Sequence, residues 1–219
     1  MIRICPSILN ANFDDLPGEI EKVASTADLI HLDVMDNVFV PNFTFSPERT
    51  REIIDFSALP IDVHLMVAEV DEKVSQYSSK NAVSMTVHFE ACQDPLQTLK
   101  NIRSLGKRAG LAIKPDTPIE VVEELLPAID MIVVMTVEPG FGGQSFMASM
   151  MPKVEKARRY LEQRKLNDVW LQIDGGISLS TIETARRAGA DTFVAGSAVY
   201  KSENPASMVE QLRTLANNC

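Results

Sequence analysis

The stretch LIHLDVMDNVFVPN, residues 29–42, begins as an apolar run that carries two polar side chains, His31 and Asp33. Residues i and i+2 of a β-strand point to the same side, so a strand here would bury both groups on one face. Burying a charged group without a partner is costly. The stretch therefore predicts a buried strand whose polar face meets partner groups, or a bound ion, supplied from elsewhere in the fold.

Similar short apolar runs recur along the whole chain and alternate with amphipathic segments. With residues 29–36, the candidate strands number eight; the others are 3–9, 61–67, 84–90, 109–114, 131–137, 169–174 and 191–197. Helical spacing of apolar residues marks 13–25, 94–106, 118–129, 149–165, 178–190 and 205–218. In the second of these, Asp94 suits the N-cap, Pro95 the first helical position and Gly106 the end.

Apolar strands separated by helices indicate a parallel sheet covered by helices. Eight such units without a long linker predict an α/β fold, a (β/α)₈ TIM barrel that forms a single catalytic domain over residues 1–219. The alternative is an open doubly wound sheet, which usually has a glycine-rich turn after its first strand. The sequence NANFDD, residues 10–15, has no such glycine.

Composition narrows the classes of function. The net charge is −9 and no run is rich in Lys or Arg, so we expect no nucleic-acid partner. No apolar run approaches the roughly 20 residues that span a bilayer, and the N-terminus lacks a signal-peptide pattern. The cysteines Cys5, Cys92 and Cys219 form no CxxC pair. We therefore expect a cytoplasmic protein with no membrane partner.

Polar residues cluster near the ends of the predicted strands, where TIM barrels place their active sites. His31 and Asp33 lie in one strand, His64 in DVHLMV and Asp174 in LQIDGG. Two imidazoles and two carboxylates suit a divalent transition metal such as Zn, Fe, Mn or Co. The sequence thus predicts that His31, Asp33, His64 and Asp174 hold one metal ion. A buried histidine more often only forms hydrogen bonds, and for His88 in VHFE we expect that role or a place in the barrel lining.

Three methionines, Met35, Met66 and Met135, fall at or near strand ends. Methionine commonly fills gaps in a core. The alternative is a polarisable, non-titrating wall that keeps water away from a reactive carbanion. Both interpretations remain open from the sequence.

Glycine-rich segments follow the last three predicted strands. They are EPGFGGQSF after residues 131–137, DGGIS after 169–174 and AGSAVY after 191–197. Glycine lets backbone N–H groups approach a ligand closely, and TIM barrels often bind phosphate at their last loops. These segments contain no Lys or Arg. They predict a phosphate site made of backbone amides rather than simple tight turns.

The sequence thus predicts a metal site, two carboxylates and a phosphate-binding site. Together these features suit a small sugar phosphate as the substrate. A metal can polarise a carbonyl and a neighbouring hydroxyl, and two carboxylates on opposite faces can remove and return a proton through an enediolate. The motifs PSIL, HLDVMDNVFVPN, DVHLMV, VEPGFGGQSF, DGGI and AGSAVY, in this order along the whole chain, resemble the ribulose-phosphate 3-epimerase family. The resemblance implies a cytoplasmic isomerase of carbohydrate metabolism, in the pentose phosphate pathway, that interconverts D-ribulose 5-phosphate and D-xylulose 5-phosphate with a divalent metal.

The resemblance also assigns site residues. It implies that Asp33 and Asp174 are the catalytic acid/base pair and that both join His31 and His64 as metal ligands. Substrate contacts are implied at Ser7, His64, Gly140, Phe141, Gly142, Gly143, Asp174, Gly175, Gly176, Gly196 and Ser197. Met35, Met66 and Met135 match an active-site wall. We also expect a homo-oligomer.

Other functions stay open. Close relatives act on allulose 6-phosphate and tend to have a serine after the DG of the seventh strand, where this chain has Gly176. A decarboxylase of a keto-acid sugar phosphate would typically use a lysine near a strand end, and Lys114 is the one candidate. A non-enzymatic phosphosugar-binding barrel would tolerate loss of a ligand or a base, and no such loss is visible.

Overall fold

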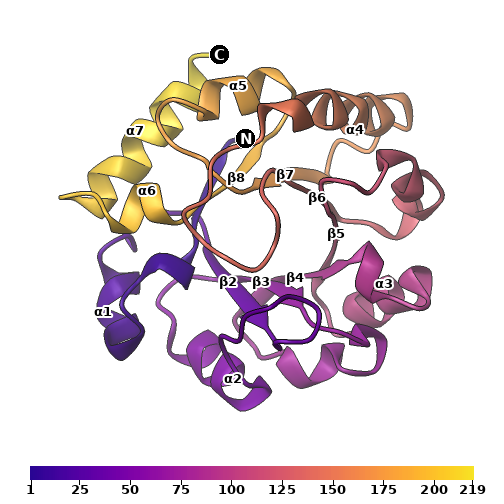
Figure 1. Cartoon of the computed structure of the whole chain (residues 1–219), viewed down its shortest axis with the longest axis horizontal. Coiled ribbons are helices and arrows are strands. Elements are labelled where there is room, and N and C mark those ends of the chain that lie inside the picture. The colour runs from indigo at the N-terminus through magenta and orange to yellow at the C-terminus, as the bar shows by residue number, and fades with distance from the viewer.

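The computed structural model describes residues 1–219, and its centre is a ring of parallel strands surrounded by helices (Figure 1). The strands are β1 (Arg3–Pro6), β2 (Ile30–Met35), β3 (Ile61–Met66), β4 (Ala82–His88), β5 (Arg108–Ile113), β6 (Met131–Met135), β7 (Trp170–Asp174) and β8 (Thr192–Ala195). They form one sheet in the order β1-β8-β7-β6-β5-β4-β3-β2. This confirms the predicted (β/α)₈ barrel, and each predicted strand coincides with an observed one.

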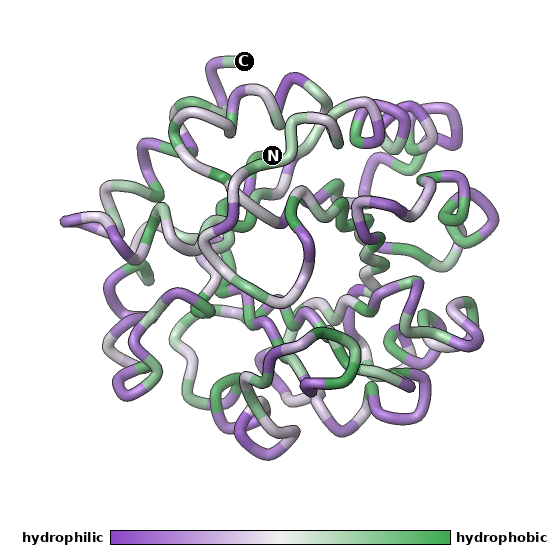
Figure 2. Tube along the Cα trace, in the orientation of Figure 1, coloured by the Kyte–Doolittle hydropathy of each residue, from purple (hydrophilic) through white to green (hydrophobic).

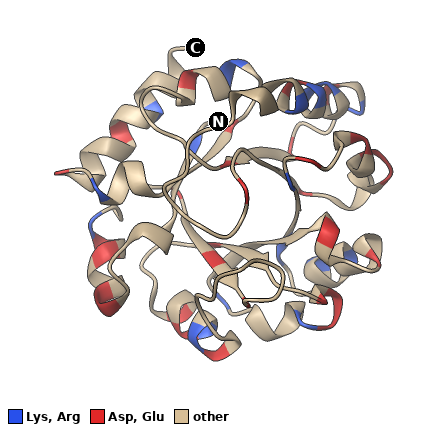
Figure 3. Cartoon of the chain, viewed as in Figure 1, with Lys and Arg blue, Asp and Glu red and all other residues tan.

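Seven α-helices lie outside the ring of strands. They are α1 (Leu16–Glu21), α2 (Pro47–Phe56), α3 (Pro95–Ser104), α4 (Met151–Gln163), α5 (Ile182–Arg187), α6 (Ser197–Tyr200) and α7 (Pro205–Asn217). Hydropathy colouring shows a mostly apolar ring of strands and mixed outer helices (Figure 2), and the charged residues are spread over those helices (Figure 3). None of the helices combines the length and the apolar character that crossing a bilayer requires.

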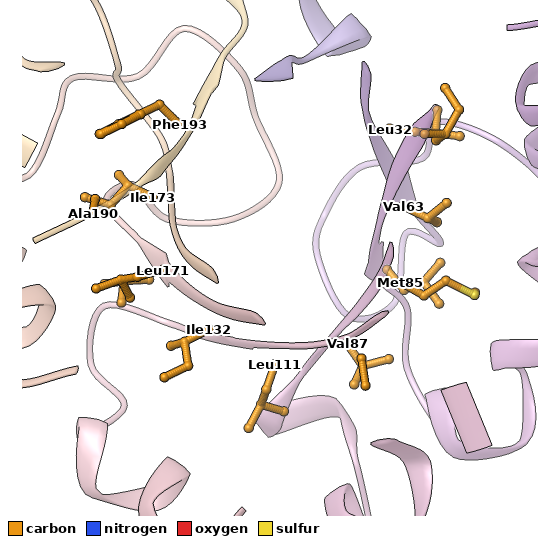
Figure 4. Close-up of a cluster of buried hydrophobic side chains, with 14 of the residues drawn as sticks. Leu32, Val63, Met85, Val87, Leu111, Ile132, Leu171, Ile173, Ala190 and Phe193 are labelled. Carbon is orange, nitrogen blue, oxygen red and sulfur yellow. The ribbon is translucent and has the colours of Figure 1, made fainter. Parts of the chain in front are cut away.

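Side chains alternate strictly along β2 and β3, and this alternation directs polar groups into the barrel. Outward-pointing residues such as Leu32 and Val63 fill the layer between the strands and the helices (Figure 4). The intervening residues of β2 and β3, including His31, Asp33 and His64, therefore point into the barrel. All residues of both strands are buried. The apolar layer thus fixes the strand register that brings the polar side chains together.

The predicted end signals of α3 are confirmed. The Asp94 side chain accepts a hydrogen bond from the backbone N–H of Gln97 at 3.0 Å, and Pro95 is the first helical residue. Gly106 follows the helix with a φ of +73°, a conformation that favours glycine.

Two crossovers differ from regular α-helices. The segment Ile119–Ala128 forms a 3₁₀-helix, with i→i+3 hydrogen bonds such as Ile129 N–H to Leu126 O at 3.3 Å. Pro127 lacks an N–H and its ring would clash with the carbonyl four residues earlier in an α-helix. Between β3 and β4 the chain makes only two short 3₁₀-helices, Val70–Glu72 and Val74–Tyr77. The α/β alternation is therefore incomplete at these two crossovers.

The barrel closes between β1 and β2 without a continuous ladder. The two strands meet at the β-bridge between Ser7 and His31, and Asp28 N–H donates to the Ile4 carbonyl at 3.1 Å. The Ile4 N–H in turn donates to the Asp28 carboxylate at 2.8 Å. These contacts form what we call the β1–β2 seam, and its upper end lies beside the polar cluster inside the barrel.

Candidate active site

Four side chains from three strands converge inside the barrel. The Nδ1 atom of His64 lies 3.2 Å from Asp33 Oδ1 and 3.2 Å from Asp174 Oδ2. The Nε2 atom of His31 lies 3.3 Å from Asp33 Oδ1 and 3.6 Å from Asp174 Oδ2. One ligand-type atom from each of the four residues falls within 4.8 Å of the other three. The predicted metal-ligand set is therefore brought together by the fold.

This donor set fits a divalent metal ion. Both imidazoles are fully buried, and Asp33 is only 4% exposed. Two carboxylates and two imidazoles supply the nitrogen and oxygen ligands that Zn, Fe, Mn and Co accept. Asp174 is the last residue of β7, and Asp33 and His64 lie in the C-terminal halves of β2 and β3, towards the end where TIM barrels carry their active sites. His31, the second residue of β2, lies deeper in the barrel.

The two carboxylates make the cluster a favourable place for a positive charge, and the pKa values of its residues reflect this. Burial would lower the pKa of His31, but Asp33, Asp174 and Asp62 hold it well above its usual value. Burial would likewise raise the pKa of Asp33, but His31 and His64 hold it far below its usual range. The pKa of Asp174 is also lowered, because its hydrogen bonds to His31 and His64 outweigh burial. The carboxylates are therefore ionised near neutral pH, which suits them to a cation.

A second layer of hydrogen bonds holds the two histidines in place. His31 Nδ1 lies 2.8 Å from Asp62 Oδ2, and Asp62 also accepts from Ser84 Oγ at 2.6 Å and Gln172 Nε2 at 2.8 Å. Asp62 was not among the predicted site residues, although the spacing in DVH places it on the same face as His64. A carboxylate that orients a ligand histidine from behind is typical of protein metal sites.

His88 has the hydrogen-bonding role that we expected as one of its two alternatives. Its Nε2 lies 2.9 Å from His64 Nε2, and its Nδ1 lies 3.3 Å from Glu90 Oε2. Burial, together with the neighbouring His64, lowers the pKa of His88 to about 4 despite Glu90. His88 is therefore a neutral residue behind the cluster.

The pocket at the mouth of the barrel contains most of the remaining predicted site residues. It is lined by Ser7, Asp33, Met35, Met66, Met135, Gly140, Phe141, Gly142, Gly143, Asp174, Gly175, Gly176, Gly196 and Ser197. His31 and His64 lie beneath it and are fully buried. The three methionines are almost entirely buried, so they fill space and line the pocket at once. No Lys or Arg lines the pocket, and Lys114 is not among its residues.

Three glycines at this pocket occupy positions where a side chain would be strained or would collide with a neighbour. Gly176 has a φ of +67°, and a Cβ there would lie 2.5 Å from the Phe146 nitrogen. A Cβ on Gly142 would come within 2.7 Å of the Asn10 side chain, and one on Gly196 within 2.5 Å. Asn10 thus lies against both segments at the pocket, a position that the sequence analysis missed because the residue follows β1 without any recognisable motif.

Two loops over the mouth contact each other. The segment between β6 and α4 crosses in front of the barrel opening (Figure 1). The Asn42 side chain, from the segment after β2, donates a hydrogen bond to the Gly140 carbonyl at 2.9 Å. The pocket is therefore covered in part by segments nearly 100 residues apart.

The fold and the site together define a TIM-barrel enzyme with a buried cluster of two histidines and two aspartates that could hold a metal ion beneath a glycine-lined pocket. The chain belongs to the ribulose-phosphate 3-epimerase family, whose model matches residues 3–200, and it is therefore an isomerase.

Curated relatives of similar length support this placement. The protein named ribulose-phosphate 3-epimerase from Bacillus subtilis is 38% identical over 97% of this chain and 99% of its own length. Proteins of the same name from Mycobacterium leprae and Synechocystis are 42% and 40% identical, over 97% of this chain and 94% and 93% of their own lengths.

Solved structures with little sequence identity share the fold. KGPDC from Streptococcus mutans matches with a TM-score of 0.74 at 14% identity, over 100% of this chain and 98% of that one. A 3-hexulose-6-phosphate synthase matches with a TM-score of 0.66 at 18% identity, over 98% of this chain and 99% of that one. At such low identity these likenesses concern the barrel alone.

Proposed function

We propose that the whole chain, residues 1–219, is one catalytic domain that interconverts D-ribulose 5-phosphate and D-xylulose 5-phosphate. The observation that carries the proposal is the convergence of His31, Asp33, His64 and Asp174 beneath a glycine-lined pocket. The names of the curated relatives support the substrate. Gly176, which follows DG in β7 and its loop, favours this substrate over allulose 6-phosphate.

In this proposal Asp33 and Asp174 are the acid/base pair. They extend from β2 and β7, which have β1 and β8 between them around the ring, so they reach the pocket from different sides. One carboxylate removes the C3 proton, and the other delivers a proton to the opposite face of the sugar. Both carboxylates are ionised in the free site, so one of them takes up a proton when the substrate binds, and the roles exchange in the reverse direction. One carboxylate alone could not reach both faces of a substrate held in place.

The same residues would hold one divalent metal ion, Zn, Fe, Mn or Co. When bound, the ion would polarise the carbonyl and adjacent hydroxyl of the sugar and stabilise the enediolate charge. His31 and His64 would bind the ion beside the two carboxylates, and Met35, Met66 and Met135 exclude water from the reacting carbon. Backbone amides of the glycine segments around Gly140 to Gly143, Gly175, Gly176, Gly196 and Ser197 hold the phosphate.

Two further expectations belong to the proposal. The chain works in a reducing cytoplasm, which is supported by three cysteines that are all unpaired. It forms a homo-oligomer, and Val38 and Phe43, which are 75% and 59% exposed, supply apolar surface that an interface would cover. Light scattering coupled to gel filtration tests the oligomer.

Proton exchange with deuterated solvent tests the mechanism. Asp33→Asn and Asp174→Asn keep an oxygen that can bind a metal but cannot act as a base, and only samples that retain the metal are compared. We expect each variant to lose exchange of the C3 proton from one epimer only, and the two variants to lose it from opposite epimers. Asp168→Asn, at the other end of the barrel, serves as the control. Near-normal epimerisation by either metal-loaded active-site variant would overturn the two-base mechanism.

A further inference from the structure

A line of three hydrogen-bonding groups runs outward from the cluster through β4. His64 Nε2 lies 2.9 Å from His88 Nε2, and His88 Nδ1 lies 3.3 Å from Glu90 Oε2. The two rings lie edge to edge, with 20° between their planes and 5.0 Å between their centroids, and both are fully buried. Between His64 Nε2 and His88 Nε2, one ring nitrogen donates its proton and the other accepts it, so the hydrogen bonds along this line run in one direction.

The direction is set at the Glu90 end. Its Oε1 accepts from the Lys114 backbone N–H at 2.8 Å and from the Thr117 hydroxyl, which leaves Oε2 for His88. An ionised carboxylate only accepts hydrogen bonds, so His88 carries its proton on Nδ1. Its Nε2 then offers a lone pair, and His64 must donate from its own Nε2. The remaining nitrogen of His64, Nδ1, is the atom that faces Asp33 and Asp174.

His31 and His64 face the centre of the cluster with different ring nitrogens, Nε2 and Nδ1, because they lie at different depths in the barrel. In the β2–β3 ladder His64 pairs with Asp33, whereas His31 pairs with Asp62, so His31 lies two residues deeper in the barrel. The deeper ring reaches the cluster with its distal atom Nε2, and the nearer ring uses its proximal atom Nδ1. Asp62 fixes the proton on His31 Nδ1 directly. No carboxylate touches His64 Nε2, so that ring requires an intermediary.

We propose that His88 and Glu90 are positioning residues that fix the proton of His64 on Nε2 and thereby present its Nδ1 lone pair to a divalent metal ion. The inference deepens the proposed function and rests on the metal site within it. His88 and Glu90 act through His64 and touch neither the substrate nor the reacting atoms. Outer hydrogen-bond partners of this kind typically contribute about 10- to 100-fold to metal affinity.

Nitrogen-15 NMR of the histidine rings tests the proton positions without any metal. The chain contains three histidines, and all three lie in this site, so the ring region of the spectrum reports on nothing else when the affinity tag has no histidine. We expect a proton on Nε2 of His64, and on His88 a proton on Nδ1 but none on Nε2. Glu90→Gln offers an amide that can donate as well as accept, so we expect mixed ring forms at His88 and His64. A proton on Nε2 of His88, or its absence from Nε2 of His64, in the parent protein would overturn the proposal.

Zinc affinity, measured by competition with a coloured chelator, tests the consequence. His88→Met removes the acceptor and keeps an apolar side chain of similar length, so we expect zinc binding to weaken about 10- to 100-fold. His88→Gln can place its Oε1 near the position of Nε2, so we expect it to recover most of that loss. Glu90→Gln provides a second variant that retains the buried imidazole if His88→Met does not fold.

Thr86→Val is the matched control. Thr86 lies two residues before His88 on the same face of β4, is fully buried, and its hydroxyl has no hydrogen-bond partner. We expect parent-like zinc affinity from it. Equal zinc affinity in the parent, His88→Met and Glu90→Gln would overturn the positioning role while leaving the metal site intact. A parent protein that binds no zinc, iron, manganese or cobalt would instead overturn the metal site itself, and the NMR result would still decide the proton positions.

Discussion

The Nδ1 atom of His31 lies 2.8 Å from Oδ2 of Asp62, and both side chains are completely buried. This contact orients the imidazole so that its other nitrogen faces the cluster. Hydrogen bonds and the charge of His31 hold the pKa of Asp62 below its usual value even though burial alone would raise it. Asp62 is therefore an ionised carboxylate in the centre of the barrel, and its removal has consequences for both folding and metal binding.

Replacing Asp62 with alanine should destabilise the protein by about 3 kcal/mol or more, because a buried charge pair loses one partner. Zinc affinity should also fall about 10- to 100-fold, since His31 is no longer held in one orientation. Urea unfolding of metal-free protein and chelator competition measure the two effects. Ser84→Ala, which removes only one hydrogen bond to Asp62, should cause smaller changes in both. Unchanged zinc affinity in Asp62→Ala would contradict this role.

Removing a predicted ligand should release the metal. We expect elemental analysis to find about one divalent ion per chain in the parent protein, and His31→Ala or His64→Ala to bind it much more weakly. A strong chelator should abolish epimerase activity, and one of the four metals should restore it. Full activity in protein verified to contain no metal would show that the cluster is not a metal site.

The phosphate site should respond to the loss of glycine. Gly196→Val would bring a side chain against Asn10, where a Cβ alone would already lie 2.5 Å from its oxygen. We expect a strongly raised KM for the sugar phosphate with the metal still bound, and we expect unphosphorylated ribulose to be a poor substrate for the parent protein. Steady-state kinetics and metal analysis measure these changes.

Gly106→Ala is the control for that substitution. Gly106 also has a positive φ, +73°, but it lies at the end of α3 and a Cβ there meets nothing within 4 Å. It should lower stability by about 1 kcal/mol through backbone strain alone and leave KM unchanged. If unphosphorylated ribulose turned over as well as its phosphate, the assignment of the glycine segments would be wrong.

A carboxylate far from the site should make stability depend on pH. Asp130 accepts from Arg103 at 2.9 and 3.0 Å and from the Ala109 N–H at 2.9 Å. Burial would raise the pKa of Asp130, but these hydrogen bonds outweigh it and lower the pKa. A lowered pKa contributes stability above the unfolded value of about 3.9, and this contribution is lost as the pH falls below it.

Asp130→Asn should therefore cost about 1 kcal/mol near neutral pH, a value reduced by the partial exposure of both side chains. The difference from the parent should shrink as the pH falls from about 4 towards 3. Urea unfolding at several pH values measures it. Glu155→Gln, which removes a more exposed pair with Arg159 at 4.0 Å, should have little effect at any pH. An equal cost for Asp130→Asn at low and neutral pH would contradict the linkage.

The sequence predicted the barrel because its strands carry their signal locally. The alternation in β2 and β3 separates apolar residues such as Leu32 from polar ones such as Asp33, and that pattern alone identifies buried strands. The crossover at Ile119–Ala128 was harder, because its apolar spacing also suits an α-helix and only Pro127 indicates otherwise. Helical periodicity does not distinguish an α-helix from a tight 3₁₀-helix over so short a segment.

The four residues of the metal-ligand cluster could also be predicted from local sequence, but the contacts behind them could not. His31 and Asp33 share a strand, and His64 and Asp174 fall at the ends of other strands, so barrel geometry brings them together. The contacts behind them depend on register: Asp62 reaches His31 only because the β2–β3 ladder pairs these two residues. Strand register in a parallel barrel is set by packing across the whole sheet, which no short motif contains.

The β1–β2 seam has a mechanical consequence. Because few backbone hydrogen bonds join these two strands, local opening of the barrel costs least there. Ser7 Oγ donates to Asp33 Oδ2 across that junction at 2.5 Å, so each opening also separates two groups at the pocket. A ligand that contacted both Ser7 and Asp33 would hold the ends of β1 and β2 together. Binding at these two residues would then oppose local opening of the barrel between β1 and β2.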